Sequence, residues 1–254
     1  MAREHRPRTA PSIPGVTGVM TRFFLSARRL MLAALAAGPF LLGAGVVFPS
    51  TGQALAADDL HFSPNEIRDW STRVFAGETE YRVVELDGTQ ALRARARRRA
   101  SAKYLEREID LGETPYLQWC WRVSGVHEGL DETRKSGDDY PARVYVARKT
   151  GLLPWQVESV NYVWASQQPA GSAWPNAFTS RARLLALQSG DARVGEWVAE
   201  VRDVGADYRR LFGSRATRID GLALMSDGDN AGVDATAWFT HLAFSASPTP
   251  PSCP

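Results

Sequence analysis

Residues 116–123 read YLQWCWRV, and this stretch decides the fold class. Apolar residues stand at every second position from Leu117 to Val123, two of them tryptophans, with Gln, Cys and Arg between them. Successive side chains of a β-strand point to opposite faces, so this alternation predicts a strand with one face in a core. A helix would not collect these apolar residues on one side.

Similar runs recur about every ten residues, with turn-forming Gly, Pro, Asn and Asp between them. This spacing predicts an all-β protein, an antiparallel β-sandwich of the jelly-roll type. Short helical turns are expected at Pro64–Trp70 and Asp207–Phe212. The predicted strands are Tyr81–Leu86, Ala91–Arg98, Lys103–Leu111, Tyr116–Val123, Ala142–Arg148, Val160–Ala165, Arg183–Gln188, Glu196–Val204, Gly221–Ser226 and Thr236–Ser245.

The N-terminal part has the features of a secretory signal peptide. Arginines precede the uncharged apolar run Leu30–Phe48, and a small-x-small site ends at Ala56. We expect residues 1–56 to be a signal peptide with an N-terminal extension, cleaved after Ala56. A membrane anchor is the alternative reading, since the run approaches the length of a bilayer span. The glycines and proline within it favour cleavage, which leaves no stable membrane span and an exported protein, periplasmic or extracellular.

Residues 57–246 are then expected to form a single β-sandwich domain, and the Pro-rich residues 247–254 a disordered tail. Six of the 30 basic residues and one of the 28 acidic residues precede residue 57, so 24 basic and 27 acidic residues remain, a formal net charge of −3. This balance gives no support for nucleic-acid binding.

The chain has two cysteines, Cys120 in the middle of a predicted strand and Cys253 in the Pro-rich tail. Export would permit a disulfide bond. Because the two positions differ so much in context, we expect them not to pair. Two cysteines are also too few for a zinc site built on thiolates.

Several predicted strands carry long polar side chains on the face that should point away from the core. Arginine, asparagine and glutamate there can hydrogen-bond a hydroxyl-rich ligand, and aromatic rings give flat apolar platforms for it. The alternative is a solvated face stabilised by cross-strand charge pairs. The candidate ligand-binding residues are Arg122, Arg143, Tyr145, Asn161, Glu200 and Arg202.

Catalytic candidates are few. Asp138 and Asp139 lie at the expected rim of this face, and either could pair with Glu200 as acid and base in glycosidic chemistry. Sequence does not give the separations of these carboxylates. Trp155 and Trp174 lie in expected loops, where a tryptophan can stack on a sugar ring or cap the end of the sandwich. We favour the cap, because large aromatic side chains are usually buried.

A metal site is a further alternative at the segment DGDNAG, residues 227–232. Asp227, Asp229 and Asn230 supply oxygen ligands of the kind that calcium prefers. The segment lacks a closing glutamate, and a plain turn explains it equally well. Calcium is therefore the one cofactor that the sequence suggests.

The chain resembles a bacterial family of uncharacterised exported proteins, domain of unknown function 3047. The resemblance rests on the ordered motifs TPYLQWCWRV, KSGDDYPARVYV, NYVWA, WPN, EVRDVGADYRRLFG and DGLALMSDGDNAG, and it covers the chain from Trp70 to Phe244. It implies an exported single-domain β-sandwich and brings no established activity. The expected sandwich is itself carbohydrate-binding-module-like or galactose-binding-like, which is an analogy of fold alone.

Three functions are compatible with these features. The leading hypothesis is binding of a carbohydrate or cell-envelope glycan on the polar sheet face. The first alternative is a glycoside hydrolase or polysaccharide lyase that uses carboxylates on the same face, and the second is a structural envelope protein without a ligand. The oligomeric state stays open.

Overall fold

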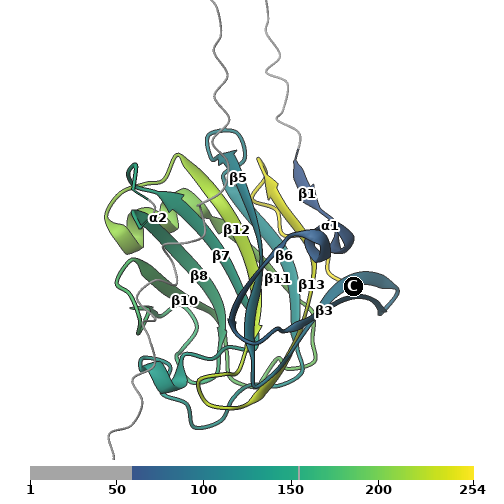
Figure 1. The fold of residues 1–254 in the computed structure, drawn as a ribbon. Helices are drawn as coiled ribbons and strands as arrows, with labels where there is room; N and C mark the ends of the chain where they lie inside the picture. Colours follow the sequence, from purple (N-terminus) through teal and green to yellow (C-terminus); the bar gives the residue numbers. More distant parts are fainter. Residues whose placement is uncertain (1–58, 154) are drawn as a thin grey trace, which may run out of the picture.

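The computed structural model describes residues 59–153 and 155–254. The predicted signal peptide and its cleavage site lie outside the described residues. Within them, two β-sheets pack face to face, and only short helices accompany them (Figure 1). The prediction of an all-β sandwich is confirmed.

The first layer is a six-stranded sheet. In the YLQWCWRV strand the alternating residues Leu117, Trp119, Trp121 and Val123 belong to the hydrophobic core. Gln118 and Cys120, on the other face, are buried as well. The strand order is β11 (Val198–Asp203), β6 (Tyr116–Val123), β13 (Asp234–Ser245), β4 (Thr89–Arg97) and β3 (Glu80–Leu86), with β1 (Leu60–Phe62) paired to β13.

The second layer is a seven-stranded sheet. Strands β8 and β10 pair in parallel, and the other described pairs in both sheets are antiparallel, so the antiparallel prediction holds except at this pair. The order is β2 (Ser71–Ala76), β5 (Ala100–Asp110), β12 (Arg218–Asp227), β7 (Arg143–Lys149), β8 (Val157–Ala165), β10 (Ala182–Ser189) and β9 (Ala173–Pro175).

Aromatic side chains from both sheets meet in the core. Trp119 packs edge-on against Trp121 on β6, and each also contacts an aromatic ring of β8, Tyr162 and Trp164 respectively. All four side chains are fully buried. Burial of such large apolar surfaces is the main force that holds the two layers together.

Two short helices close the ends of the sandwich. Helix α1 (Pro64–Asp69) begins with a capping box, in which Ser63 and Glu66 satisfy each other's backbone N–H groups. Helix α2 (Val204–Phe212) is capped by Asp203 at its N-terminus and by Gly213 at its C-terminus, where a φ of 80° suits glycine. Both agree with the predicted helical turns. Among the described residues, no helix is both long and apolar enough for a membrane crossing.

The prediction that the cysteines stay unpaired is wrong, because Cys120 and Cys253 form a disulfide bond. Cys120 points to the outer face of β6, and β13 lies beside β6. The tail that leaves β13 therefore starts next to β6 and returns across it. Residues 247–254 contain no helix or strand, but Gln118 Nε2 also donates to the Ser247 carbonyl at 2.6 Å, so this tail is held at two points.

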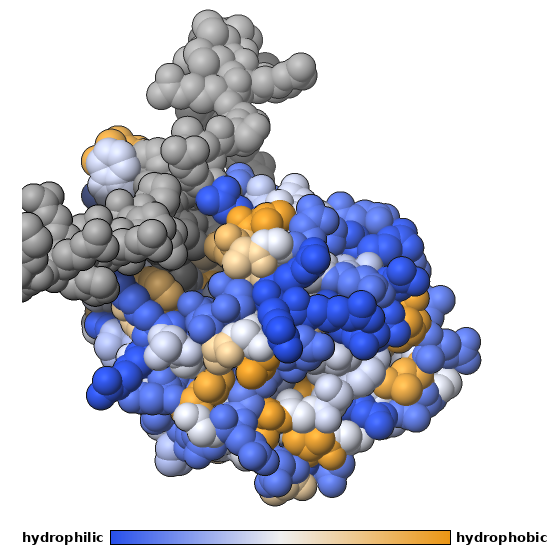
Figure 2. Space-filling view, turned by 60° about the horizontal axis from the view of Figure 1, so that its bottom comes forward, coloured by the Kyte–Doolittle hydropathy of each residue, from blue (hydrophilic) through white to orange (hydrophobic). Residues whose placement is uncertain are grey.

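The outer surface is mostly polar on the side seen in Figure 2. Hydrophilic residues predominate there, and apolar residues form small separate patches. Among large apolar side chains of the described residues, Leu152 and Trp155 stand out as exposed, and both belong to the segment between β7 and β8.

Candidate functional site

A cleft of about 430 Å³ lies on the outer face of the seven-stranded sheet. Val144 and Val146 of β7 point into the core, whereas Arg143 and Tyr145 point the other way and line this cleft. The predicted division of ARVYV into two faces is confirmed. Strands β2, β5, β12, β7 and β8 supply the floor, and the segments that precede β8 and follow β9 supply the walls.

Aromatic side chains line much of the cleft. Trp155 is 51% exposed at the rim, so the expectation that it caps the sandwich is wrong. Trp174 is buried as expected, but it lies in strand β9 and not in a loop, and it packs against Tyr140. The aromatic residues that line the cleft are Phe75, Tyr104, Tyr145, Trp155 and Phe178.

A buried ion pair forms the floor at one end of the cleft. Arg143 Nε donates to Asp227 Oδ1 at 2.8 Å, and its Nη2 donates to Asp227 Oδ2 and to the Asp138 carbonyl. The guanidinium also lies 4.2 Å from the centre of the Tyr140 ring. Because arginine presents its donors in a rigid fork, these contacts fix both side chains.

Asp138 and Asp139 connect this end of the cleft to neighbouring loops. Asn176 Nδ2 donates to Asp138 Oδ2 at 2.9 Å. The backbone N–H groups of Asn230 and Ala231 donate to the two oxygens of Asp139, at 3.2 and 2.6 Å. Asp138 thus joins the segment before β7 to the segment after β9, and Asp139 joins it to the turn after β12.

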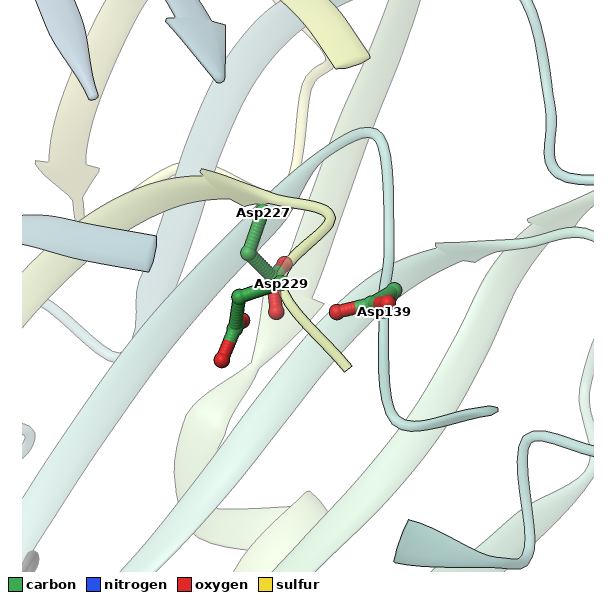
Figure 3. Close-up of side chains that lie close together, drawn as sticks. All are labelled: Asp139, Asp227 and Asp229. Atoms are coloured by element: carbon green, nitrogen blue, oxygen red, sulfur yellow. The ribbon is translucent and has the colours of Figure 1, made fainter. Parts of the chain in front are cut away.

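Three carboxylates from these segments lie close together. Figure 3 shows Asp227 at the end of β12, Asp229 in the turn after it, and Asp139 in the segment before β7. One oxygen of each lies within 4.8 Å of the others, which is close enough to hold a metal ion. The predicted metal site named Asn230 instead of Asp139, but Asn230 Nδ2 donates to Asp139 Oδ1 at 3.2 Å.

The environment of Asp138, Asp227 and Asp229 disfavours the charged forms of these three residues. Burial raises the pKa of Asp138 and Asp227 above the usual value, and the Arg143 guanidinium opposes that rise. Burial and then the Asp139 carboxylate raise the pKa of Asp229 as well. Acids of like charge that share a poorly solvated site resist full ionisation.

Asn161 supplies an unused donor to the cleft. The residue is fully buried on β8, and its Nδ2 atom has no hydrogen-bond partner among the described residues. Its Oδ1 accepts from Ser159 Oγ at 3.4 Å. A buried amide N–H without a partner costs free energy, so a ligand atom that accepts from it would be stabilised.

The other predicted site residues do not join the cleft. Arg122 lies on the outer face of the six-stranded sheet, where it pairs with Asp87 at 2.7 Å. Glu200 and Arg202 point inward from β11, because they stand opposite the core residues Trp119 and Leu117 of β6. The prediction that all six ligand-binding candidates share one face is therefore wrong.

Glu200 and Arg202 have structural partners instead. Glu200 Oε1 accepts from Trp121 Nε1 at 3.2 Å and from Gln188 Nε2 at 2.7 Å, so it links the two sheets. Arg202 Nε donates to Asp207 Oδ2 of α2 at 2.9 Å. Of the catalytic candidates, Asp138 lines the cleft, Asp139 lies beside it and Glu200 lies on the other sheet.

Several cleft residues were missed by the sequence reasoning. Tyr104 stands among charged residues on β5, and Phe178 follows the WPN motif in a loop. Asn176 belongs to that motif and was noticed only as part of the resemblance. Each of these residues stands in a recognisable sequence context, but only the strand order shows that the three segments border one cleft.

Solved structures similar to this chain include a carbohydrate-binding module and an endoglucanase. A carbohydrate-binding module described for specific mannan recognition, TmCBM27, is 15% identical over 75% of this chain and 96% of its own, with a TM-score of 0.32. Endoglucanase 3 of Trichoderma harzianum, from family GH12, is 11% identical over 70% of this chain and 97% of its own, with a TM-score of 0.33.

An exo-beta-agarase is similar over a part of its length only. It is 11% identical, and the match covers 76% of this chain but 25% of the agarase, with a TM-score of 0.32. No curated protein matches this chain. The fold assignment rests on the strand pairing itself.

Most of the described chain matches the model of one protein family. Residues 68–243 match the model of a protein family described as "Protein of unknown function (DUF3047)". This range includes both sheets of the sandwich except the outermost strand β1 and the end of β13, and it includes every residue of the cleft. The chain belongs to the DUF3047 family.

Proposed function

We propose that this protein binds a carbohydrate or cell-envelope glycan in the cleft of the seven-stranded sheet. The observation that carries the proposal is the unpartnered Asn161 amide, buried in a cleft that aromatic side chains border. Binding sites of small ligands combine apolar walls with a few placed polar groups. The cleft has both.

The chemistry of a sugar ring fits this division. One face of a pyranose carries C–H groups that pack on an aromatic ring, and its edge carries hydroxyl groups that donate and accept hydrogen bonds. Trp155 offers an exposed ring at the rim, and Asn161 offers a donor on the floor. Arg143 acts as a positioning residue in this proposal, since Asp227 and Asp138 already occupy its donors.

Export forms part of the same proposal. The basic and apolar leader with its small-residue cleavage site supports it. The bond between Cys120 and Cys253 adds independent support, because disulfides persist mainly in oxidising compartments such as the periplasm or the extracellular space. Edman sequencing of the mature protein from a bacterial host tests it, and an N-terminus at Ala57 is expected.

Binding to a panel of polysaccharides and oligosaccharides tests the glycan proposal. Trp155→Ala and Asn161→Ala should each weaken binding of a retained glycan about tenfold, since each removes one contact of ordinary strength. Trp238→Ala is the matched control, because Trp238 lies on the outer face of the six-stranded sheet beside Arg122. The Trp238→Ala variant should bind the retained glycan with the same affinity as the unchanged protein.

Two outcomes contradict the proposal. The first is absence of binding to every member of the panel. The second is wild-type affinity in both cleft variants, which would place the glycan elsewhere. Absence of all binding would favour the structural envelope role, with the polar face as part of the scaffold.

A hydrolase or lyase is the second candidate, and the carboxyls with raised pKa at one end of the cleft favour it. A carboxyl with a raised pKa keeps its proton to a higher pH than an ordinary aspartate does, which suits a general acid. The proposal then uses Asp138 and Asp229, since Glu200 does not line the cleft. Release of reducing ends from a bound polysaccharide, abolished by Asp229→Asn, would establish it. Binding without turnover would exclude it for that glycan.

Calcium at Asp139, Asp227 and Asp229 is an alternative occupant of this end of the cleft, which experiment can distinguish from the glycan. Its support is the approach of the three carboxylates. Against it, the backbone N–H groups of Asn230 and Ala231 occupy both oxygens of Asp139. Calorimetric titration of the chelator-treated protein with calcium tests it directly.

A further inference from the structure

The charges of the cleft are unevenly distributed along its length. Glu106 and Arg181 lie toward one end, where Glu106 stands opposite Gly221 and the Arg181 carbonyl accepts from the Ser159 N–H. The negative charge of Glu106 and the positive charge of Arg181 therefore cancel at this end of the cleft. At the other end, the single guanidinium of Arg143 faces several carboxylates. They are Asp138, Asp139, Asp227 and Asp229.

Most oxygen atoms of this acidic end already accept hydrogen bonds. Both oxygens of Asp227 bind Arg143, and both oxygens of Asp139 bind backbone N–H groups. Two carboxylates keep free capacity toward the cleft. Asp138 Oδ1 is buried without a hydrogen-bond partner, 3.6 Å from Arg143 Nη1, and Asp229 is half-buried with one long contact of 3.5 Å from Asn230 Nδ2.

This pattern favours a ligand that brings positive charge and a few donors. Calcium requires six to eight oxygen ligands, more than the free atoms here supply. A primary ammonium requires about three acceptors and presents three N–H donors.

We propose that the cleft selects a glycan with a free amino group, whose ammonium lies at Asp229 and Asp138 while its sugar ring lies toward Asn161 and Trp155. The inference rests on the proposed glycan binding and names its substrate class. An N-acetylated sugar presents one amide N–H and no charge at the same position. Discrimination between the two forms is therefore electrostatic, and shape plays the smaller part.

The test compares two probes of equal length, a β-1,4-linked glucosamine tetramer and its fully N-acetylated counterpart. At pH 6 and low salt the glucosamine tetramer should bind about tenfold more tightly, as expected for charge-assisted hydrogen bonds. Asp229→Asn should remove this preference and leave the affinity for the acetylated tetramer nearly unchanged. Asp234→Asn is the control, because this exposed aspartate lies on β13 of the other sheet.

Each outcome has a distinct meaning. Equal affinity for both tetramers, or a preference that survives Asp229→Asn, overturns the amine inference and leaves glycan binding intact. Failure of both tetramers while a neutral glycan of the panel binds also overturns it. Failure of the whole panel overturns the glycan proposal itself.

Two further binding experiments vary the concentrations of salt and of calcium. Sodium chloride at 0.5 M should weaken binding of the glucosamine tetramer more than that of the acetylated one, because screening acts on the charged contact. Calcium alone should give no saturable heat. Saturable calcium binding that Asp229→Asn abolishes would show that a metal, not an ammonium, neutralises this end of the cleft, and would overturn the inference.

Discussion

Arg143 is the residue on which the acidic end of the cleft depends. It is 4% exposed, and it joins the end of β12 to the segment before β7 through Asp227 and the Asp138 carbonyl. A buried pair of this kind need not stabilise the fold relative to an apolar pair of equal size. Its removal on one side alone is costly, since it leaves a buried charge without a partner.

Arg143→Leu should therefore lower the free energy of unfolding by about 3–5 kcal/mol, measured by urea denaturation. The double variant Arg143→Leu/Asp227→Leu should recover part of that loss, because no buried charge is left behind. Arg134→Leu is the control. It interrupts an exposed pair with Asp131 and should change the stability little. Wild-type stability in Arg143→Leu would contradict the assigned role of the pair.

At the residue scale, the sequence allowed half of the site to be predicted. Arg143, Tyr145 and Asn161 were identified because alternation along β7 and β8 separates their faces. Arg122 and Glu200 were assigned to the same site because they also interrupt apolar alternation. A polar residue in a strand does not reveal which of the two sheets it belongs to, and only long-range pairing decides that.

The strands and helices themselves followed from local pattern. The predicted strands correspond to β3–β8 and β10–β13, whereas the short strands β1, β2 and β9 were missed. At β11 the alternation of polar and apolar side chains was predicted correctly. The polar side chains were assigned to the outer face, however, whereas they point toward the core. Edge position explains this, because an edge strand can turn polar side chains inward where solvent still reaches them. Glu200 does so, and remains partly exposed while it accepts from Trp121.

The inward position of Glu200 has a pH-dependent consequence. Burial raises the pKa of Glu200 above its usual value of 4.5, and the hydrogen bonds from Gln188 and Trp121 oppose that rise. A raised pKa in the folded state means that the native protein binds the proton more tightly than the unfolded chain does. The contribution of Glu200 to stability should thus decrease as pH rises from 4.5 through the folded-state pKa.

Glu200→Gln removes this titration and keeps an oxygen that accepts from both donors. Relative to the unchanged protein, the variant should become more stable as the pH is raised from 4 to 7, measured by urea denaturation at several pH values. Glu196→Gln alters an exposed side chain just before β11 and should show no such trend. A constant difference between Glu200→Gln and the unchanged protein would contradict the prediction.

At the scale of the whole molecule, the disulfide joins the C-terminal tail to the middle of the six-stranded sheet. The two cysteines are 133 residues apart in sequence. A cross-link over so long a loop restricts the unfolded chain strongly. The pairing could not be predicted from the sequence, since it depends on β13 lying beside β6, which local patterns do not encode.

Cys253→Ser should lower the free energy of unfolding by about 2–4 kcal/mol. This position is chosen because Cys120 is fully buried, and its replacement would also disturb packing. The unchanged protein in reductant should unfold at the same urea concentration as the variant, and the variant itself should not respond to reductant. A variant as stable as the oxidised protein would contradict the prediction.

Strand β12 links the cleft to the core of the sandwich. It pairs on both sides, with β5 and β7, and every residue from Ile219 to Asp227 is buried. Backbone amides in such a strand exchange with solvent only through large-scale opening. The carboxylate that ends β12 is thus held in place before any ligand arrives. Little conformational entropy of this carboxylate and of the Arg143 side chain that it binds remains to be lost on binding, so this part of the cleft is ordered in advance.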